Sequence, residues 1–143
     1  MKIRTILERK QPGVVTISTL STLKAAAELM ARRRIAALVV TEDGQPVGLL
    51  SERHIVEVFA REGKLAEEMR IRQILDRQLI AISPEDTIKR AMSLMTNTRL
   101  RHLPVMNENG LVGIVSLGDL VKQRLEELEL EANVLRDIYI AVH

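Results

Sequence analysis

Cysteine and tryptophan are absent from this 143-residue sequence, which also has only one phenylalanine and one tyrosine. Without cysteine the chain cannot form a disulfide scaffold, a thiolate nucleophile or a cysteine zinc site. Because aromatic residues make up only 1% of the chain, we expect no surface that stacks nucleic-acid bases on aromatic rings. Imidazole could come only from His54, His102 and His143. Their spacing does not match that of metal ligands, so we expect no metal site.

An excess of charge of one sign is also missing, because 21 basic residues stand against 19 acidic ones and leave a formal net charge of +2. Such a balance offers little attraction to polyanions, so nucleic-acid binding is not expected. No apolar stretch has the length of a signal peptide or a membrane span. We therefore expect a cytoplasmic protein that does not act at a membrane. Apolar residues, at 46%, suffice to build a hydrophobic core.

The sequence contains an internal repeat. Aligning Ser51 with Ser116, an offset of 65 residues, gives 14 identical pairs over the 40 positions from 17 to 56. Chance would match roughly one position in fifteen, and many of the remaining pairs keep their chemical character, such as Leu49 and Ile114. The chain is therefore a tandem duplication.

The hydrophobic pattern predicts the order β-α-β-β-α in each copy. In the first copy we expect strands over 14–17, 35–41 and 46–50, a helix capped by Ser21 or Thr22, and a helix over 52–60. In the second copy we expect strands over 79–82, 101–106 and 111–115, and helices over 84–96 and from 117 onward. The connecting stretch 65–75 is expected to be helical.

A single copy of about 60 residues has little apolar area to bury. We therefore expect a mixed α/β (α+β) fold in which the two copies pack face to face about a pseudo-twofold axis and leave a cleft at their seam. The expected division is a first repeat with its N-terminal segment at 1–64, a second repeat with a linker helix at 65–124, and a helical extension at 125–143.

The last helix is predicted to continue well beyond the second repeat, to about residue 142, because no glycine follows Gly118 and no proline interrupts it. Seven of its apolar residues alternate steps of four and three, which is the heptad spacing of a helix that packs along one side. They are Val121, Leu125, Leu128, Ala132, Leu135, Tyr139 and Val142. This stripe is expected to cover either the chain's own surface or the same helix in another subunit.

A motif of glycine, two apolar residues, serine, two further residues and aspartate ends the last strand and opens the last helix of the second copy, over 113–119. Ser116 occupies the position that caps a helix, where free N–H groups attract phosphate. Asp119 could accept two hydrogen bonds from a ribose diol, and Gly113 lets a ligand approach the strand end. Ser116 and Asp119 could equally be a capping pair with no ligand.

In its repeat, its motif and the order of its elements, the chain resembles proteins with tandem CBS domains over about residues 6–124. The resemblance implies an adenine-nucleotide-sensing module, in which adenine lies between the first strand of the second copy and the segment after its first helix. The residues implied are Ala81, Ile82 and Ser83 on one side and Arg101, His102, Leu103 and Pro104 on the other. Arg101 could also point toward phosphates.

A second and weaker site is expected in the first copy at Thr16, Ser51, Arg53 and His54, because His54 stands where the motif has aspartate. A neutral imidazole cannot accept a pair of hydrogen bonds as a carboxylate does, so this site should bind ribose less tightly. Alternatively, Arg53 and His54 hold the phosphate or the second half of a longer ligand such as NAD.

The resemblance implies a regulatory module without enzymatic activity that binds AMP or, failing that, ATP, ADP or NAD, and acts on a separate protein of unknown identity. Because CBS pairs commonly associate as disc-like dimers, we expect a homodimer with the last helix at or near the interface. One alternative is a structural interaction module with vestigial clefts. Another is an enzyme, which would need a nucleophile–base pair or a metal, and neither is visible in the sequence.

Overall fold

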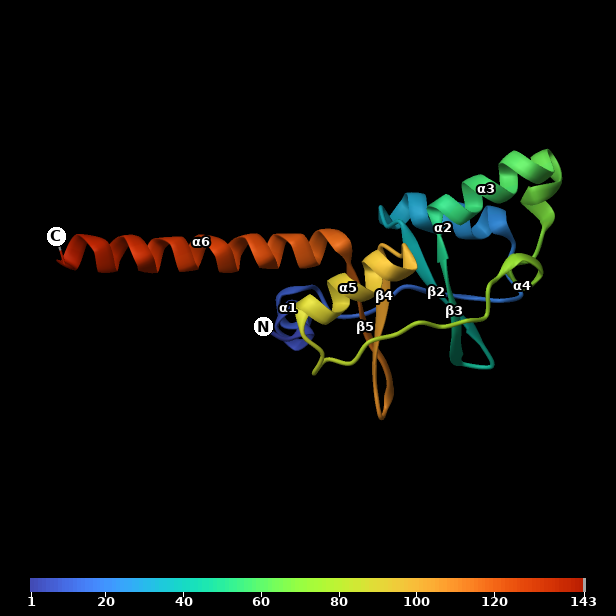
Figure 1. Cartoon of the computed structure of the whole chain (residues 1–143). Coiled ribbons are helices and arrows are strands. Elements are labelled where there is room, and N and C mark those ends of the chain that lie inside the picture. The colour runs from blue at the N-terminus through green and yellow to red at the C-terminus, as the bar shows by residue number, and fades with distance from the viewer. Residues whose placement is uncertain (143) are drawn as a thin grey trace.

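The computed structural model describes residues 1–142, which fold into two small α+β units followed by a projecting helix (Figure 1). The first part of the chain contains α1 (Ile3–Arg9), β1 (Thr16–Ser18), α2 (Leu23–Arg33), β2 (Ala37–Glu42), β3 (Gln45–Ser51), α3 (Glu52–Glu62), the 3₁₀ helix η1 (Gly63–Glu68) and α4 (Ile71–Ile74). The second part contains α5 (Ile88–Thr98), β4 (His102–Asn107), β5 (Gly110–Ser116) and α6 (Leu117–Val142). The predicted mixed fold with two repeats is confirmed.

The two sheets are unequal. In the first repeat β1 pairs in parallel with β2, which pairs antiparallel with β3. In the second repeat only the β4–β5 hairpin forms a sheet. The predicted strand over 79–82 is wrong, because this stretch makes a single bridge between Ile82 and Val105. Its composition explains the difference: residues 14–17 are all β-branched, whereas residues 79–82 alternate isoleucine with leucine and alanine, and a turn follows at Ser83.

Threonine caps open the first helix of both repeats. Thr22 accepts a hydrogen bond from the N–H of Ala25 at 3.1 Å, and Thr87 accepts one from Arg90 at the same distance. Both helices also end alike, on an arginine in the left-handed conformation. The cap predicted at Ser21 or Thr22 is therefore confirmed at Thr22.

Replacing Thr22 by alanine is expected to lower the free energy of unfolding by about 1 kcal/mol, because an N–H of the first helical turn loses its acceptor. Thr87→Ala should cost a similar amount. Thr96→Ala is the control, since the Thr96 hydroxyl only donates back to the carbonyl of Met92 within α5. Urea unfolding measures all three variants. A control loss as large as the cap losses would contradict this assignment.

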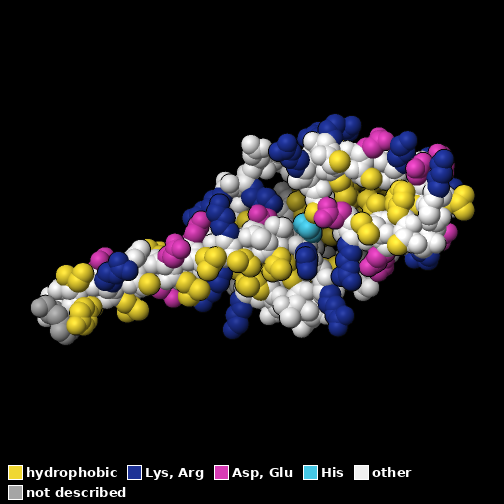
Figure 2. Space-filling view, turned by 90° about the horizontal axis from the view of Figure 1, so that it is seen from above, with side chains coloured by type: hydrophobic (Ala, Val, Ile, Leu, Met, Phe, Trp, Pro, Cys, Tyr) yellow, Lys and Arg dark blue, Asp and Glu magenta, His cyan; other side chains and the backbone are white. Residues whose placement is uncertain are grey.

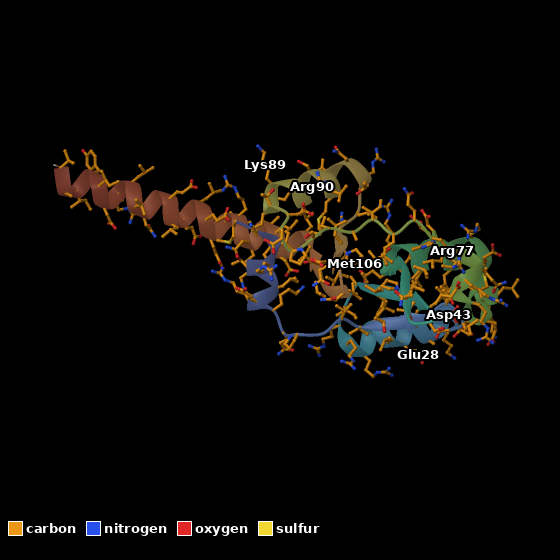
Figure 3. All side chains as sticks on the ribbon, turned by 90° about the horizontal axis from the view of Figure 1, so that it is seen from below. Glu28, Asp43, Arg77, Lys89, Arg90 and Met106 are labelled. Carbon is orange, nitrogen blue, oxygen red and sulfur yellow. The ribbon has the colours of Figure 1, made fainter. Side chains whose placement is uncertain are left out.

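The two hydrophobic cores exchange the helices that precede the repeats. Ile3 and Ile6 of α1 lie in the core of the second repeat, whereas Ile71 of α4 lies in the core of the first. The exchange is anchored by main-chain bridges, from Lys2 to Thr87 and from Arg70 to Thr22. Beyond α4, Arg77, labelled in Figure 3, donates to both carboxylate oxygens of Glu42, at 3.0 and 2.7 Å. The domain division at residues 64 and 65 stays a prediction.

Helix α6 projects away from the rest of the chain (Figure 1), and its bounds, Leu117–Val142, match the predicted helix. Only Leu120 and Gln123 of this helix are buried. The alternative in which the helix folds back over its own repeats is therefore wrong. Over the described residues, no helix is both long enough and apolar enough to span a membrane.

Candidate functional site

The junction of β5 and α6 forms a reciprocal cap. The hydroxyl of Ser116 accepts a hydrogen bond from the N–H of Asp119 at 3.1 Å, and the Asp119 Oδ2 accepts one from the N–H of Ser116 at 2.9 Å. The N–H of Leu117 donates to the carbonyl of Arg101 at 2.8 Å. The capping interpretation of Ser116 and Asp119 is thus present in the structure, and it fixes the carboxylate at the start of the helix.

Lys10 binds this carboxylate from the segment that follows α1. Its Nζ donates to the Asp119 Oδ2 at 2.7 Å and to the carbonyl of Ile114 at 2.9 Å. The lysine reaches this point because α1 packs against β5, where Leu7 lies directly over Gly113. Sequence reasoning missed Lys10, because nothing near it in the chain resembles the motif over 113–119.

Charge and burial act together on Asp119 and His102. Burial alone would raise the pKa of Asp119, but hydrogen bonds from Lys10 and Ser116 outweigh it and hold the pKa below its usual value. Burial lowers the pKa of His102, an effect that the nearby Asp119 carboxylate opposes and Lys10 reinforces. At neutral pH the site therefore offers an ionised carboxylate and a neutral imidazole.

A cleft of about 370 Å³ opens beside Ser116, and both repeats contribute its walls. We call it the Ser116 cleft. The second repeat supplies His102, Gly113 and Ser116, while the first supplies the segment 10–15, which includes Lys10, and the stretch 34–37. The cleft thus crosses the seam between the repeats, as the sequence predicted for a nucleotide cleft.

A second cleft, of about 530 Å³, lies beside Ser51 and is called the Ser51 cleft. Arg53 lines it from the first repeat, and Arg99, Arg101 and His102 line it from the second. The 65-residue offset relates its walls to those of the Ser116 cleft. Each cleft therefore joins the helix start of one repeat to the strand edge of the other, and His102 lies between the two.

The structure brings only some of the predicted site residues together. Gly113, Ser116 and His102 line the Ser116 cleft. Asp119 does not line it, but its carboxylate binds Lys10 and Ser116, which do. Arg101 lines the Ser51 cleft with Ser51, Arg53 and His102, and not the Ser116 cleft, which is its predicted position. The remaining predicted residues line neither cleft: Thr16, His54, Ala81, Ile82, Ser83, Leu103 and Pro104. Their roles stay predictions.

Local contacts explain several of these placements. Leu103 is fully buried in the core of the second repeat, and Ile82 is buried with it. Ser83 accepts a hydrogen bond from the N–H of Glu85 in the turn before α5. His54 donates its backbone N–H to Ser51 at 3.2 Å, in the same position along the helix as Asp119. Within residues 1–142, no lysine or arginine binds the His54 side chain as Lys10 binds Asp119.

Two α+β repeats that share clefts across their seam define a paired-domain module. The CBS domain family model matches residues 6–61 and 71–126, so the chain belongs to the CBS domain family. The chain is 32% identical over 115 residues to a mitochondrial CBS domain-containing protein, CBSX3, of Arabidopsis thaliana. The match covers 77% of this chain and 56% of that protein, so the chain spans little more than half of this relative's length.

Solved structures show the same architecture. The CBS-domain protein ATU1752 from Agrobacterium tumefaciens superposes with a TM-score of 0.83 at 31% identity, covering 87% of this chain and 99% of that one. The CBS domain pair of protein MJ0100 superposes with a TM-score of 0.77 at 19% identity, and the match covers 89% of this chain and 98% of that one. That pair was crystallised with 5′-methylthioadenosine and S-adenosyl-L-methionine. At this identity the likeness shows the fold alone.

Proposed function

We propose that this chain is a non-enzymatic regulatory module that binds an adenine nucleotide in the Ser116 cleft. AMP is the first candidate, with ATP, ADP and NAD as alternatives. The observation that carries the proposal is the ionised Asp119 carboxylate, fixed at a helix start beside a cleft that both repeats enclose. A ligand held there touches both repeats, so its binding energy can alter how they sit together.

The chemistry of the cleft suits a nucleoside phosphate. Asp119 accepts hydrogen bonds from a ribose diol, and the start of α6 favours the negative charge of a phosphate. Arg34 and Lys10 line the same cleft and add positive charge. Lys10 donates a hydrogen bond to the Asp119 carboxylate, so a ribose must displace the ammonium group or share the carboxylate with it.

Thermal unfolding with added nucleotide tests the proposal. AMP is expected to raise the melting temperature once its concentration passes its Kd, because it binds the folded chain alone. At about 100 times the Kd the gain is about 2.7 kcal/mol, a shift of several degrees for a chain of this size. GMP and inorganic phosphate at equal concentration are the controls. No shift with AMP, ATP, ADP or NAD would contradict nucleotide binding.

A second candidate function is a structural interaction module with vestigial clefts. The observation that favours it is that Lys10 and Ser116, both residues of the chain itself, provide hydrogen-bond partners for Asp119. The same titration separates the two, since a vestigial cleft gives no nucleotide-dependent shift. The cytoplasmic location, the homodimer and the regulated protein remain part of the proposal in either case.

A further inference from the structure

Over the described residues, an apolar stripe on α6 is exposed to solvent. It consists of Val121, Leu125, Leu128, Ala132, Leu135, Tyr139 and Val142, which we call the α6 seam. All seven residues are exposed, from 40% for Val121 to 74% for Val142. Figure 2 shows hydrophobic side chains continuing along the projecting helix. An amphipathic helix gains most of its stability by packing its apolar face, so the seam predicts a partner.

The rest of the chain lies on the opposite side of the helix from the seam. The two residues of α6 that it buries are Leu120 and Gln123, at 0% and 5% exposure. In a heptad repeat these positions lie across the helix from the positions that form the seam. A second helix can therefore run along the whole seam, from its first residue onward, without displacing either repeat. At 1.5 Å per residue the seam is about 33 Å long.

We propose that α6 pairs with α6 of a second copy of this chain in a parallel, two-stranded coiled coil. The charges beside the seam select this occupant. In a parallel pair, the residue just before Leu125 faces the residue five places later in the other helix, and the same holds for the residue just before Ala132. Arg124 then faces Glu129 of the second copy, and Glu131 faces Arg136. Both pairs have opposite charges, and the twofold symmetry forms each pair twice.

Antiparallel pairing fits less well. With Ala132 opposite Leu135, it brings Glu131 against Glu131 and Arg136 against Arg136 of the second copy. A shifted antiparallel register, with Leu128 opposite Ala132, avoids these repulsions and pairs Arg124 with Glu131. It leaves Val142 without a seam partner. Only the parallel arrangement gives every seam residue a partner together with opposite charges on both flanks.

Charge reversals on the full-length chain test the pairing and its direction. Glu131→Arg and Arg136→Glu each turn two attractions into repulsions, so each should raise the dimer Kd by about tenfold. The double variant restores opposite charges only in the parallel pair and should return the Kd to about that of the parent. In the shifted antiparallel pair the double variant would be weaker than either single one, which would overturn the proposed direction. Analytical ultracentrifugation measures each Kd.

The control for these reversals is Asp137→Lys, which changes charge on the side of α6 away from the seam and should leave the Kd unchanged. Leu128→Glu with Leu135→Glu places charge within the seam and should abolish the dimer. A chain that stays monomeric at all concentrations would overturn the proposal and indicate a different occupant. A dimer that ignores the seam variants would also overturn it, because the two copies would then meet elsewhere.

The absence of cysteine from the natural sequence provides a direct contact test. Leu128→Cys alone should form a disulfide-linked dimer on oxidation, because equivalent seam residues face each other in a parallel pair. Asp137→Cys should not. Cross-linking between chains carrying Leu125→Cys and Leu135→Cys, without cross-linking of Leu128→Cys, would show antiparallel helices. None of these outcomes depends on nucleotide, so they stand apart from the proposed binding function.

Discussion

Asp119→Asn is expected to weaken the binding of AMP by about 10- to 100-fold, because hydrogen bonds to an ionised acceptor contribute about 1.5–3 kcal/mol. Asparagine has nearly the same shape, and its side-chain oxygen can still accept the N–H of Ser116 that Asp119 holds at 2.9 Å. The start of α6 therefore stays capped, and the loss reports on the missing charge. Isothermal titration calorimetry measures the Kd.

The contribution of Lys10 to binding must be separated from that of the Asp119 charge. Once Asp119 is neutral, the ammonium group that it held at 2.7 Å is unpaired beside the cleft and can attract phosphate. We therefore expect the full loss for Asp119→Asn in a Lys10→Met background, titrated with adenosine, which carries no phosphate. The control Asp137→Asn removes an exposed carboxylate on α6 and should leave the Kd unchanged. Equal affinity with and without the Asp119 charge would remove this residue from the nucleotide site.

The sequence predicts the part of the Ser116 site whose residues lie close together in the chain. Gly113, Ser116 and Asp119 are brought together by a strand end and one helical turn, so their spacing alone predicts the cap. The opposite wall comes from residues far away in the chain, and Lys10 lies 109 positions from Asp119. Only the packing of α1 on β5 brings them together, and no local pattern carries that information.

A weaker signal for this packing does exist in the sequence. Residues 2–7 read Lys-Ile-Arg-Thr-Ile-Leu and residues 70–75 read Arg-Ile-Arg-Gln-Ile-Leu, at an offset of 68 residues. An ungapped alignment at 65 does not reveal this second similarity. The two segments become α1 and α4, which occupy matching places on opposite repeats. A gapped comparison would have predicted equivalent helices, although their exchange between cores arises only from tertiary packing.

Alanine at Gly48 is expected to cost more stability than alanine at Gly113, although the repeat makes the two positions equivalent. Neither glycine has a positive φ, so the cost comes from contacts alone. At Gly48 the new Cβ would lie 2.9 Å from the backbone oxygen of Asp76, which has little room to move. At Gly113 it would lie 2.6 Å from the Cδ2 of Leu7, the end of a side chain that can rotate.

Overpacking of this kind costs about 1–3 kcal/mol, and we expect Gly48→Ala near the upper end and Gly113→Ala near the lower. Removing the opposing side chain discriminates between the two causes. Leu7→Ala should cancel most of the penalty at Gly113, whereas Leu75→Ala should leave the penalty at Gly48, because the Asp76 carbonyl remains in place. Double-mutant cycles of urea unfolding measure both couplings. Rescue of Gly48→Ala by Leu75→Ala would contradict the backbone clash, since the side chain alone would then account for the cost.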